Sequence, residues 1–216
     1  MLSVLLACAG LLSMAVADSA TFTPQVQFSS SIGVLGCKVD YNRVAYFPYL
    51  PGCDNLCVKV SYGDRSVNLL HIDTSGAAHD ISADAFTYLI TGQEASASNP
   101  VPSTPTEMEW SVISMDNCYG LIWTPDYKLP IIAESPTAVV NCKANEPSSW
   151  LANNYTLYNY VNSCCTLGVE DVCEFPSPYY GGAQPTCQLS QLGVQTSANT
   201  KCMNVAMDGI KSPCVC

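Results

Sequence analysis

The chain has 216 residues and a formal net charge of −10, with 18 acidic and only 8 basic residues. An acidic protein with so few cations repels a phosphate backbone, so we expect no nucleic acid among its partners. The length is enough for one core with a satellite, or for two small domains.

The N-terminus has the features of a secretory signal peptide over residues 1–17. The apolar run 2–16 is too short to cross a bilayer, and Ala15-Val16-Ala17 has the form of a cleavage site. No later apolar run reaches membrane length. We therefore expect a secreted, extracellular, soluble protein without membrane contact.

The cysteines predict a disulfide framework. Cys8 lies in the leader, and the remaining twelve are an even number, as expected for six bridges in an oxidising compartment. Their spacing is not that of a zinc finger. Cys164 and Cys165 are adjacent and should pair with different partners. Four cysteines precede residue 121 and eight follow it, so each half could close its own bridges: Cys37, Cys53, Cys57, Cys118, then Cys142, Cys164, Cys165, Cys173, Cys187, Cys202, Cys214, Cys216.

The first part of the mature chain alternates between polar segments and strand patterns. Residues 18–35 are rich in Thr, Ser and Gln, which predicts an extended N-terminal arm. Residues 43–47 form a short strand pattern that Pro48 ends. Residues 56–62 alternate apolar and polar side chains, a Gly-Asp turn follows, and residues 65–73 continue as a second strand.

A helix and a closing strand follow the small-residue loop 74–78. Ser82 is placed as the helix N-cap, Asp84 lies in the first turn, and Gly92 is a natural stop. Residues 93–106 form a Ser/Pro loop without periodicity. Residues 107–115 alternate again, which predicts a strand.

The C-terminal half shows little regular pattern. Prolines break the segment 121–136, where we place the boundary of the first half. A helix should begin near Ser148 or Ser149. Asn154-Tyr155-Thr156 is a glycosylation sequon, which predicts a surface position for Asn154. We expect residues 121–216 to form a cysteine-rich, irregular region that depends on its disulfides.

Three segments carry a family resemblance: Cys57-Val58-Lys59-Val60, residues 69–73 (LLHID) and residues 79–86 (HDISADAF). Their order resembles the middle of a double-psi β-barrel, as in barwin, the first domain of expansins and the bacterial rare lipoprotein A family. The run also looks like small secreted fungal proteins with this barrel. The resemblance implies a mainly β fold: a six-stranded double-psi β-barrel with a short helix over residues 36–120, followed by the disulfide-rich region.

The same resemblance suggests where a site would lie. If the loop after Asp73 folds back as in these families, His71, Asp73, His79 and Asp80 gather at one end of the barrel, over an open groove. Tyr46 and Tyr49 belong to an aromatic group that either stacks on sugar rings or packs in the core.

Three functions fit these residues. The barrel resembles that of family 45 glycoside hydrolases, in which Asp80 would be the acid. Inverting hydrolysis needs a second carboxyl about 6.5–9.5 Å away, and neither Asp40 nor Asp54 lies in the motif of the base. Alternatively, the groove binds cell-wall polysaccharide without cleaving it, as in expansins or barwin.

The expectation we favour is a non-catalytic fungal effector or elicitor at the cell wall or the plant–microbe interface, binding a host or competitor protein, a protease included. Asp73 and Asp80 are then structural. His71 and Asp73, with His79, are also possible ligands for zinc or copper. Because the chain has only two histidines, we expect no bound metal. We also expect no cofactor, and we expect the protein to be a monomer.

Overall fold

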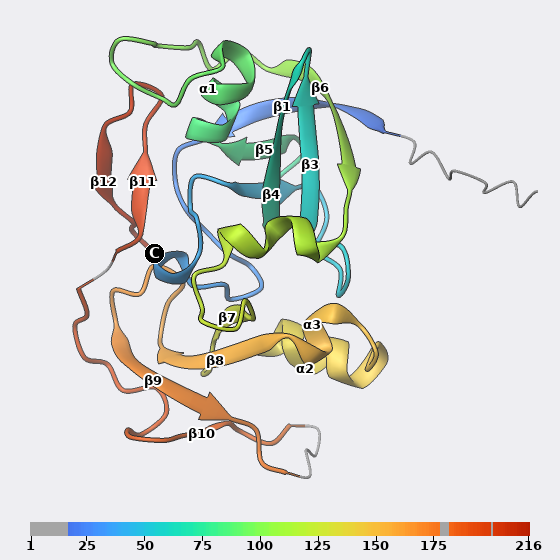
Figure 1. The fold of residues 1–216 in the computed structure, drawn as a ribbon. Helices are drawn as coiled ribbons and strands as arrows, with labels where there is room; N and C mark the ends of the chain where they lie inside the picture. Colours follow the sequence, from blue (N-terminus) through green and yellow to red (C-terminus); the bar gives the residue numbers. More distant parts are fainter. Residues whose placement is uncertain (1–16, 178–181, 200) are drawn as a thin grey trace, which may run out of the picture.

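The computed structural model describes residues 17–177, 182–199 and 201–216. The predicted signal peptide therefore lies outside the described residues, except for Ala17. Figure 1 shows a β-barrel in the upper part of the molecule and a small sheet with two helices below it. A hairpin near the C-terminus runs back up beside the barrel.

Six strands close the barrel in the order β1-β5-β2-β4-β3-β6. Neighbouring strands are antiparallel, apart from the parallel pairs β1–β5 and β2–β4. Exchanging β1, β2 and β3 for β4, β5 and β6 reproduces the same neighbours and directions, which is the internal symmetry of a double-psi barrel. The predicted mainly β fold with a six-stranded barrel is confirmed. The strands are β1 (Asp18–Gln25), β2 (Val44–Phe47), β3 (Cys57–Tyr62), β4 (Arg65–Thr74), β5 (His79–Ser82) and β6 (Thr106–Val112).

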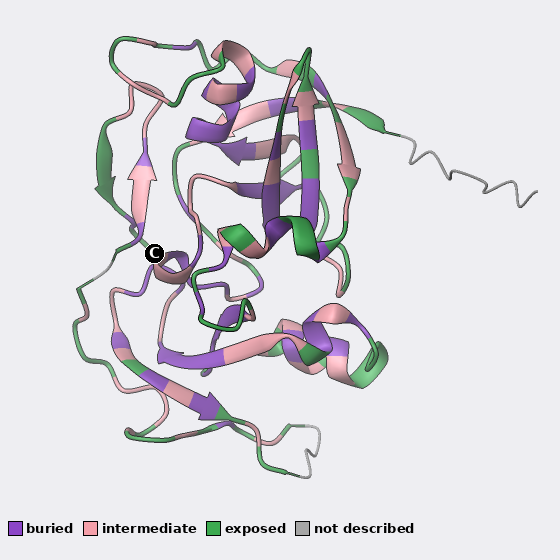
Figure 2. Cartoon of the chain, viewed as in Figure 1, coloured by how far each residue is buried: buried purple, intermediate pink, exposed green. Residues whose placement is uncertain are grey.

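Alternation of side chains fills the barrel. Along β3, Val58 and Val60 are buried while Lys59 is exposed, which Figure 2 shows as alternating colours. Inward side chains of the six strands form one apolar cluster with Phe86 and Leu89 of helix α1 (Ala83–Thr91). The helix thus covers one end of the barrel interior, and burial of these apolar side chains stabilises the barrel.

The sequence prediction for helix α1 is confirmed, with one change at its cap. Gly92 ends the helix with φ +80°, and its N–H donates to Tyr88. Arg65 donates to the carbonyls of Leu89 and Ile90, at 2.6 and 2.9 Å. Ser82 is the N-cap residue, but its hydroxyl donates to the Asn42 carbonyl instead of accepting from the helix.

The predicted N-terminal arm is wrong over its first eight residues, which form strand β1. This strand pairs with β5 on one side and β6 on the other. Phe22 is its one fully buried side chain, and the remaining positions are polar or partly exposed. Backbone hydrogen bonds to two neighbouring strands hold β1 in the barrel. Because these bonds do not depend on side-chain type, the polar composition of the segment did not predict a strand.

The C-terminal region is more regular than predicted. A four-stranded sheet in the order β10-β9-β8-β7 lies beside two short helices, and a separate two-stranded hairpin follows. The described elements are β7 (Leu129–Ile132), α2 (Thr137–Asn145), α3 (Trp150–Asn153), β8 (Tyr155–Tyr160), β9 (Gly168–Glu174), β10 (Thr186–Cys187), β11 (Met203–Val205) and β12 (Lys211–Pro213), with short 3-10 helices η1 (Gly36–Lys38) and η2 (Met115–Leu121). The helix expected after Ser149 is present but has only four residues.

The barrel and the C-terminal sheet share a hydrophobic cluster. Leu70 and Ile72 on the outer side of the barrel are buried in the same cluster as Ile131 and Leu157 of the sheet. The sheet is also connected to the segment before the barrel, because Val34 bridges to Ile131. The two parts are therefore held together by a buried apolar contact.

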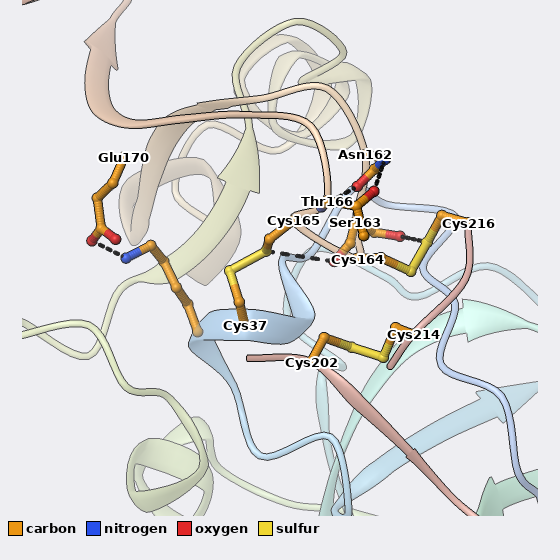
Figure 3. The surroundings of a disulfide bond; sticks show 11 residues. Cys37, Asn162, Ser163, Cys164, Cys165, Thr166, Glu170, Cys202, Cys214 and Cys216 are labelled. Atoms are coloured by element: carbon orange, nitrogen blue, oxygen red, sulfur yellow. Dashed lines mark hydrogen bonds and ion pairs between the residues drawn. A yellow bond between two sulfur atoms is a disulfide. The ribbon is translucent and has the colours of Figure 1, made fainter. Parts of the chain in front are cut away.

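All twelve predicted cysteines pair, and Cys164 and Cys165 have different partners, as expected. The expectation that each half closes its own bridges is wrong, because Cys37–Cys165 and Cys53–Cys142 connect the two halves. An even count is compatible with either arrangement, and only the contact between the halves decides it. The remaining four bridges are Cys57–Cys118, Cys164–Cys216, Cys173–Cys187 and Cys202–Cys214. Figure 3 shows Cys37–Cys165, Cys164–Cys216 and Cys202–Cys214 close together.

Replacing Gly168 by alanine should destabilise the C-terminal sheet by about 2 kcal/mol or more. Gly168 has φ +118°, and a Cβ there would lie 2.4 Å from the Asn159 carbonyl oxygen. Neither the backbone of β8 nor that of β9 can move away without breaking their pairing. Gly120→Ala is the matched control, since nothing lies within 4 Å of its Cβ position. Chemical unfolding of both variants measures the difference, and equal midpoints would contradict the packing seen at Gly168.

Candidate functional site

Several rings meet at one end of the barrel interior, with the ring of Phe22 beneath them, its centroid 5.5 Å from that of His79. We call five of them the mouth cluster: Phe47, Tyr49, His71, His79 and Trp110. Phe47 is central, with ring centroids 4.7 Å from His71 and 4.5 Å from His79. His79 lies 5.4 Å from Trp110, and Tyr49 lies 5.4 Å from His71. The structure therefore brings together three predicted site residues, namely Tyr49, His71 and His79.

Burial lowers the pKa of both histidines of the mouth cluster. His71 is 1% exposed, and desolvation lowers its pKa to about 4, against opposing hydrogen bonds from backbone groups. Its Nε2 lies 3.1 Å from the Asp73 carbonyl oxygen. Desolvation also lowers the pKa of His79, which the charge of Asp80 opposes. The His79 Nε2 atom is buried and has no hydrogen-bond partner within the described part of the chain.

The two aspartates expected at the same place do not join the mouth cluster. Asp73 accepts hydrogen bonds from the backbone N–H groups of Ser31 and Thr74, at 2.9 and 2.7 Å. Asp80 accepts from the Thr23 hydroxyl. His79 and Asp80 are consecutive in β5, so their side chains point to opposite faces of the barrel wall. Both carboxylates are held by hydrogen bonds in the described structure.

Tyr46 is unavailable for stacking because it is 3% exposed and lies beside the segment 25–28 and strand β11, with its hydroxyl donating to the Gln27 carbonyl at 3.4 Å. Burial raises the pKa of its phenol, and the charges of Asp73 and Asp80 add to the rise. Tyr49, in contrast, is 43% exposed. Trp110 was missed as a site residue. Because Trp110 lies on the apolar face of the closing strand, the sequence predicted that its side chain is buried. It did not predict that the ring of Trp110 lies beside Tyr49.

The carboxylates considered as a hydrolytic base are also engaged. Asp40 accepts from the Asn42 N–H at 3.0 Å. Desolvation raises the pKa of Asp40, although this hydrogen bond and the charge of Arg43 both act to lower it. Asp54 accepts from the Trp150 N–H at 2.5 Å. Within the described ranges, no group of three or more His, Cys, Asp or Glu side chains could hold a metal ion.

An exposed apolar loop leaves the mouth cluster directly after β2. Pro48, Tyr49 and Leu50 are all exposed, and Leu50 reaches 66%. The loop is held at one end by Phe47, which is fully buried, and at the other by the Cys53–Cys142 bridge. We call residues 48–51 the anchor loop. Its two prolines restrict the backbone.

Hollows also lie on other surfaces. One, of about 320 Å³, lies between η1 and the C-terminal sheet and is bounded by the exposed ring of Trp123. Another, of about 580 Å³, lies on the C-terminal sheet and extends to Ser177. The sequon residue Asn154 is half-buried nearby, and its Nδ2 donates to the Trp150 carbonyl at 2.9 Å.

Comparison with protein-family models, with curated proteins and with solved structures finds no significant match. The described helices include none with the length and apolar character needed to cross a membrane. What the structure defines is a mainly β protein with a closed six-stranded barrel and six disulfides. Such a density of disulfides is typical of proteins from oxidising, extracellular compartments.

Proposed function

We propose that this is a secreted, non-catalytic protein that binds an extracellular protein of a host or competitor through the anchor loop. The observation that carries the proposal is the exposure of Tyr49 and Leu50 on a loop held at both ends. With the resemblance to secreted fungal barrel proteins, we assign it to the cell wall or the plant–microbe interface, as an effector or elicitor.

The physical support is that of a protein-binding hot spot. Aromatic side chains dominate interface energetics when they become buried at the centre of a contact. A loop that is already restrained loses little conformational entropy on binding, which favours affinity. Prolines 48 and 51 and the Cys53–Cys142 bridge supply that restraint here. A protease is one partner that such a loop would suit.

Hydrolysis and groove binding have less support from the geometry. Asp80 would need a carboxylate base, and Asp40 and Asp54 are both engaged with backbone N–H groups. Groove binding was expected to use Asp73, Asp80, His71, His79, Tyr46 and Tyr49. Of these, Tyr49 is exposed, but Tyr46 and His71 are buried and both aspartates are hydrogen-bonded to the protein.

Leu50→Asp should abolish retention of the partner without changing the fold. The mature protein is immobilised and exposed to host apoplastic fluid or competitor culture filtrate, and retained proteins are identified by mass spectrometry. Ile210→Asp is the matched control, because Ile210 is 65% exposed and Leu50 66%. We expect a protein retained by the parent and by Ile210→Asp but absent with Leu50→Asp. Identical retention by all three proteins would refute the role of the loop.

A further inference from the structure

The hollow beside Trp123 combines an exposed aromatic wall with several polar groups. Trp123 is 51% exposed, and the rest of the wall comes from four further parts of the chain. Lys38 belongs to η1, Tyr160 to β8 and Glu170 to β9, and Asn199 and Lys201 follow from the C-terminal segment. Its volume of about 320 Å³ is at the small end of the ~300–1,000 Å³ that is usual for small-molecule sites.

The wall of this hollow is held in place before any ligand binds. The Cys37–Cys165 bridge joins η1 to the C-terminal region, and Cys37 itself lines the hollow. Figure 3 shows this bridge, with Glu170 on a neighbouring segment. The backbone N–H of Trp123 donates to the Lys38 carbonyl at 2.9 Å, which fixes the chain at this position. Lys38 also forms an ion pair with Glu170 and lies 4.3 Å from the centre of the Tyr158 ring.

The indole is positioned so that much of it stays in contact with solvent. Tyr41 meets it nearly perpendicular, with ring centroids 6.1 Å apart and an interplanar angle of 83°. An exposed tryptophan presents a large, rigid apolar surface, which is costly in water unless a ligand covers it. The ring therefore offers a flat apolar surface beside carboxylate, amide, ammonium and phenol groups.

We propose that this hollow binds one pyranose residue of a glycan. The axial C–H groups on one face of a pyranose ring are apolar and suit the indole surface, while its equatorial hydroxyls need donors and acceptors at the edge. Glu170 accepts, the lysines donate, and Asn199 does both. The site is independent of the anchor loop and would attach the protein to polysaccharide while the loop binds its partner.

Other ligand classes fit the hollow less well. A simple anion is disfavoured because the Glu170 carboxylate lines the hollow and occupies Lys38. Nucleic acid is disfavoured by the net charge of −10. A dry protein contact needs a centre depleted of charged groups, and this hollow contains three charged side chains.

The test uses the three tryptophans of the full-length secreted protein as reporters. Their indole N–H signals are recorded by NMR, and the Trp123 signal is assigned from its loss in Trp123→Phe. The probes are cellohexaose, laminarihexaose, chitohexaose and hexagalacturonate, which cover neutral, acetamido and acidic pyranoses. We expect at least one probe to shift the Trp123 signal, and calorimetry then measures its affinity.

Trp123→Ala should weaken the affinity for that probe about tenfold, which is the effect of losing one aromatic contact. Tyr127→Ala is the matched control, since Tyr127 is 52% exposed and lies outside the hollow. It should leave the affinity within about twofold, a change of less than half a kcal/mol. Glu170→Gln, at an exposed side chain, should weaken binding even if Trp123→Ala fails to fold.

The proposal is overturned if no probe shifts the Trp123 signal. It is equally overturned if Trp123→Ala and Glu170→Gln bind as the parent does, or if Tyr127→Ala weakens binding as much as Trp123→Ala. Leu50→Asp should bind the probe normally, so failure of the anchor loop and failure of the glycan site give different results.

Discussion

Arg43→Met is expected to lower the free energy of unfolding by about 3–5 kcal/mol, because it leaves a buried charge without its partner. The Asp84 side chain is 6% exposed, and its Oδ2 accepts from Arg43 at 2.6 Å. The second oxygen accepts from the Ala95 N–H at 2.8 Å. This carboxylate therefore connects helix α1 to Arg43, just before β2, and to the Ser/Pro loop. Chemical unfolding at neutral pH measures the loss.

Two controls separate the buried charge from the loss of a long side chain. Lys38→Met removes an ion pair whose partner Glu170 is 68% exposed, and such pairs contribute only about 0–1 kcal/mol. Asp84→Asn retains an oxygen for the Ala95 N–H but removes the charge, so adding it to Arg43→Met should restore part of the stability. If Arg43→Met cost no more than Lys38→Met, the pair would not be buried as described.

His71 should make the protein less stable in mild acid, and His71→Phe should remove most of that loss. In the folded protein burial lowers the pKa of His71 to about 4, whereas an unfolded histidine titrates near 6.5. Between these values the unfolded chain binds a proton that the folded chain does not. Stability is therefore complete above pH 6.5 and falls by roughly 3 kcal/mol on approaching pH 4.

The measurement is denaturant unfolding at a series of pH values between 7 and 4. Phenylalanine fills a similar volume against Phe47 and Tyr49, although it loses the contact with the Asp73 carbonyl at all pH values. His79→Gln is the control, because His79 is partly exposed and should flatten the profile less. Parallel profiles for the parent and His71→Phe would mean that His71 does not titrate as the structure indicates.

Local patterns predicted the elements whose stabilising contacts are close in sequence. The alternation over residues 56–62 predicted β3, and Ser82 and Gly92 correctly bounded helix α1. The consecutive positions of His79 and Asp80 in a strand also contained the information that they diverge. The sequence did not predict strand β8. Its last four residues are all buried and three of them are tyrosine or asparagine, so the apolar–polar alternation typical of a strand is absent.

The candidate site depended more heavily on contacts between distant segments. Tyr49 and Trp110 are 61 positions apart, and Trp123, Glu170 and Asn199 come from three separate parts of the chain. Nothing in the neighbourhood of each residue indicates these meetings. The sequence could rank Tyr49 as a candidate, but the exclusion of Tyr46 followed only from its burial in the folded protein.

By itself the sequence determined the acidic character, the even set of twelve cysteines and the strand–turn–strand–helix order of the barrel. Periodicity and turn residues act over a few positions, so they can be read locally. Only the tertiary structure decided which cysteines pair, that β1 joins the barrel, and that the Asp73 carboxylate bonds to the N–H groups of Ser31 and Thr74 instead of joining the mouth cluster. These outcomes depend on packing between segments that are distant in the sequence. The free energy of that packing cannot be inferred from any one segment alone.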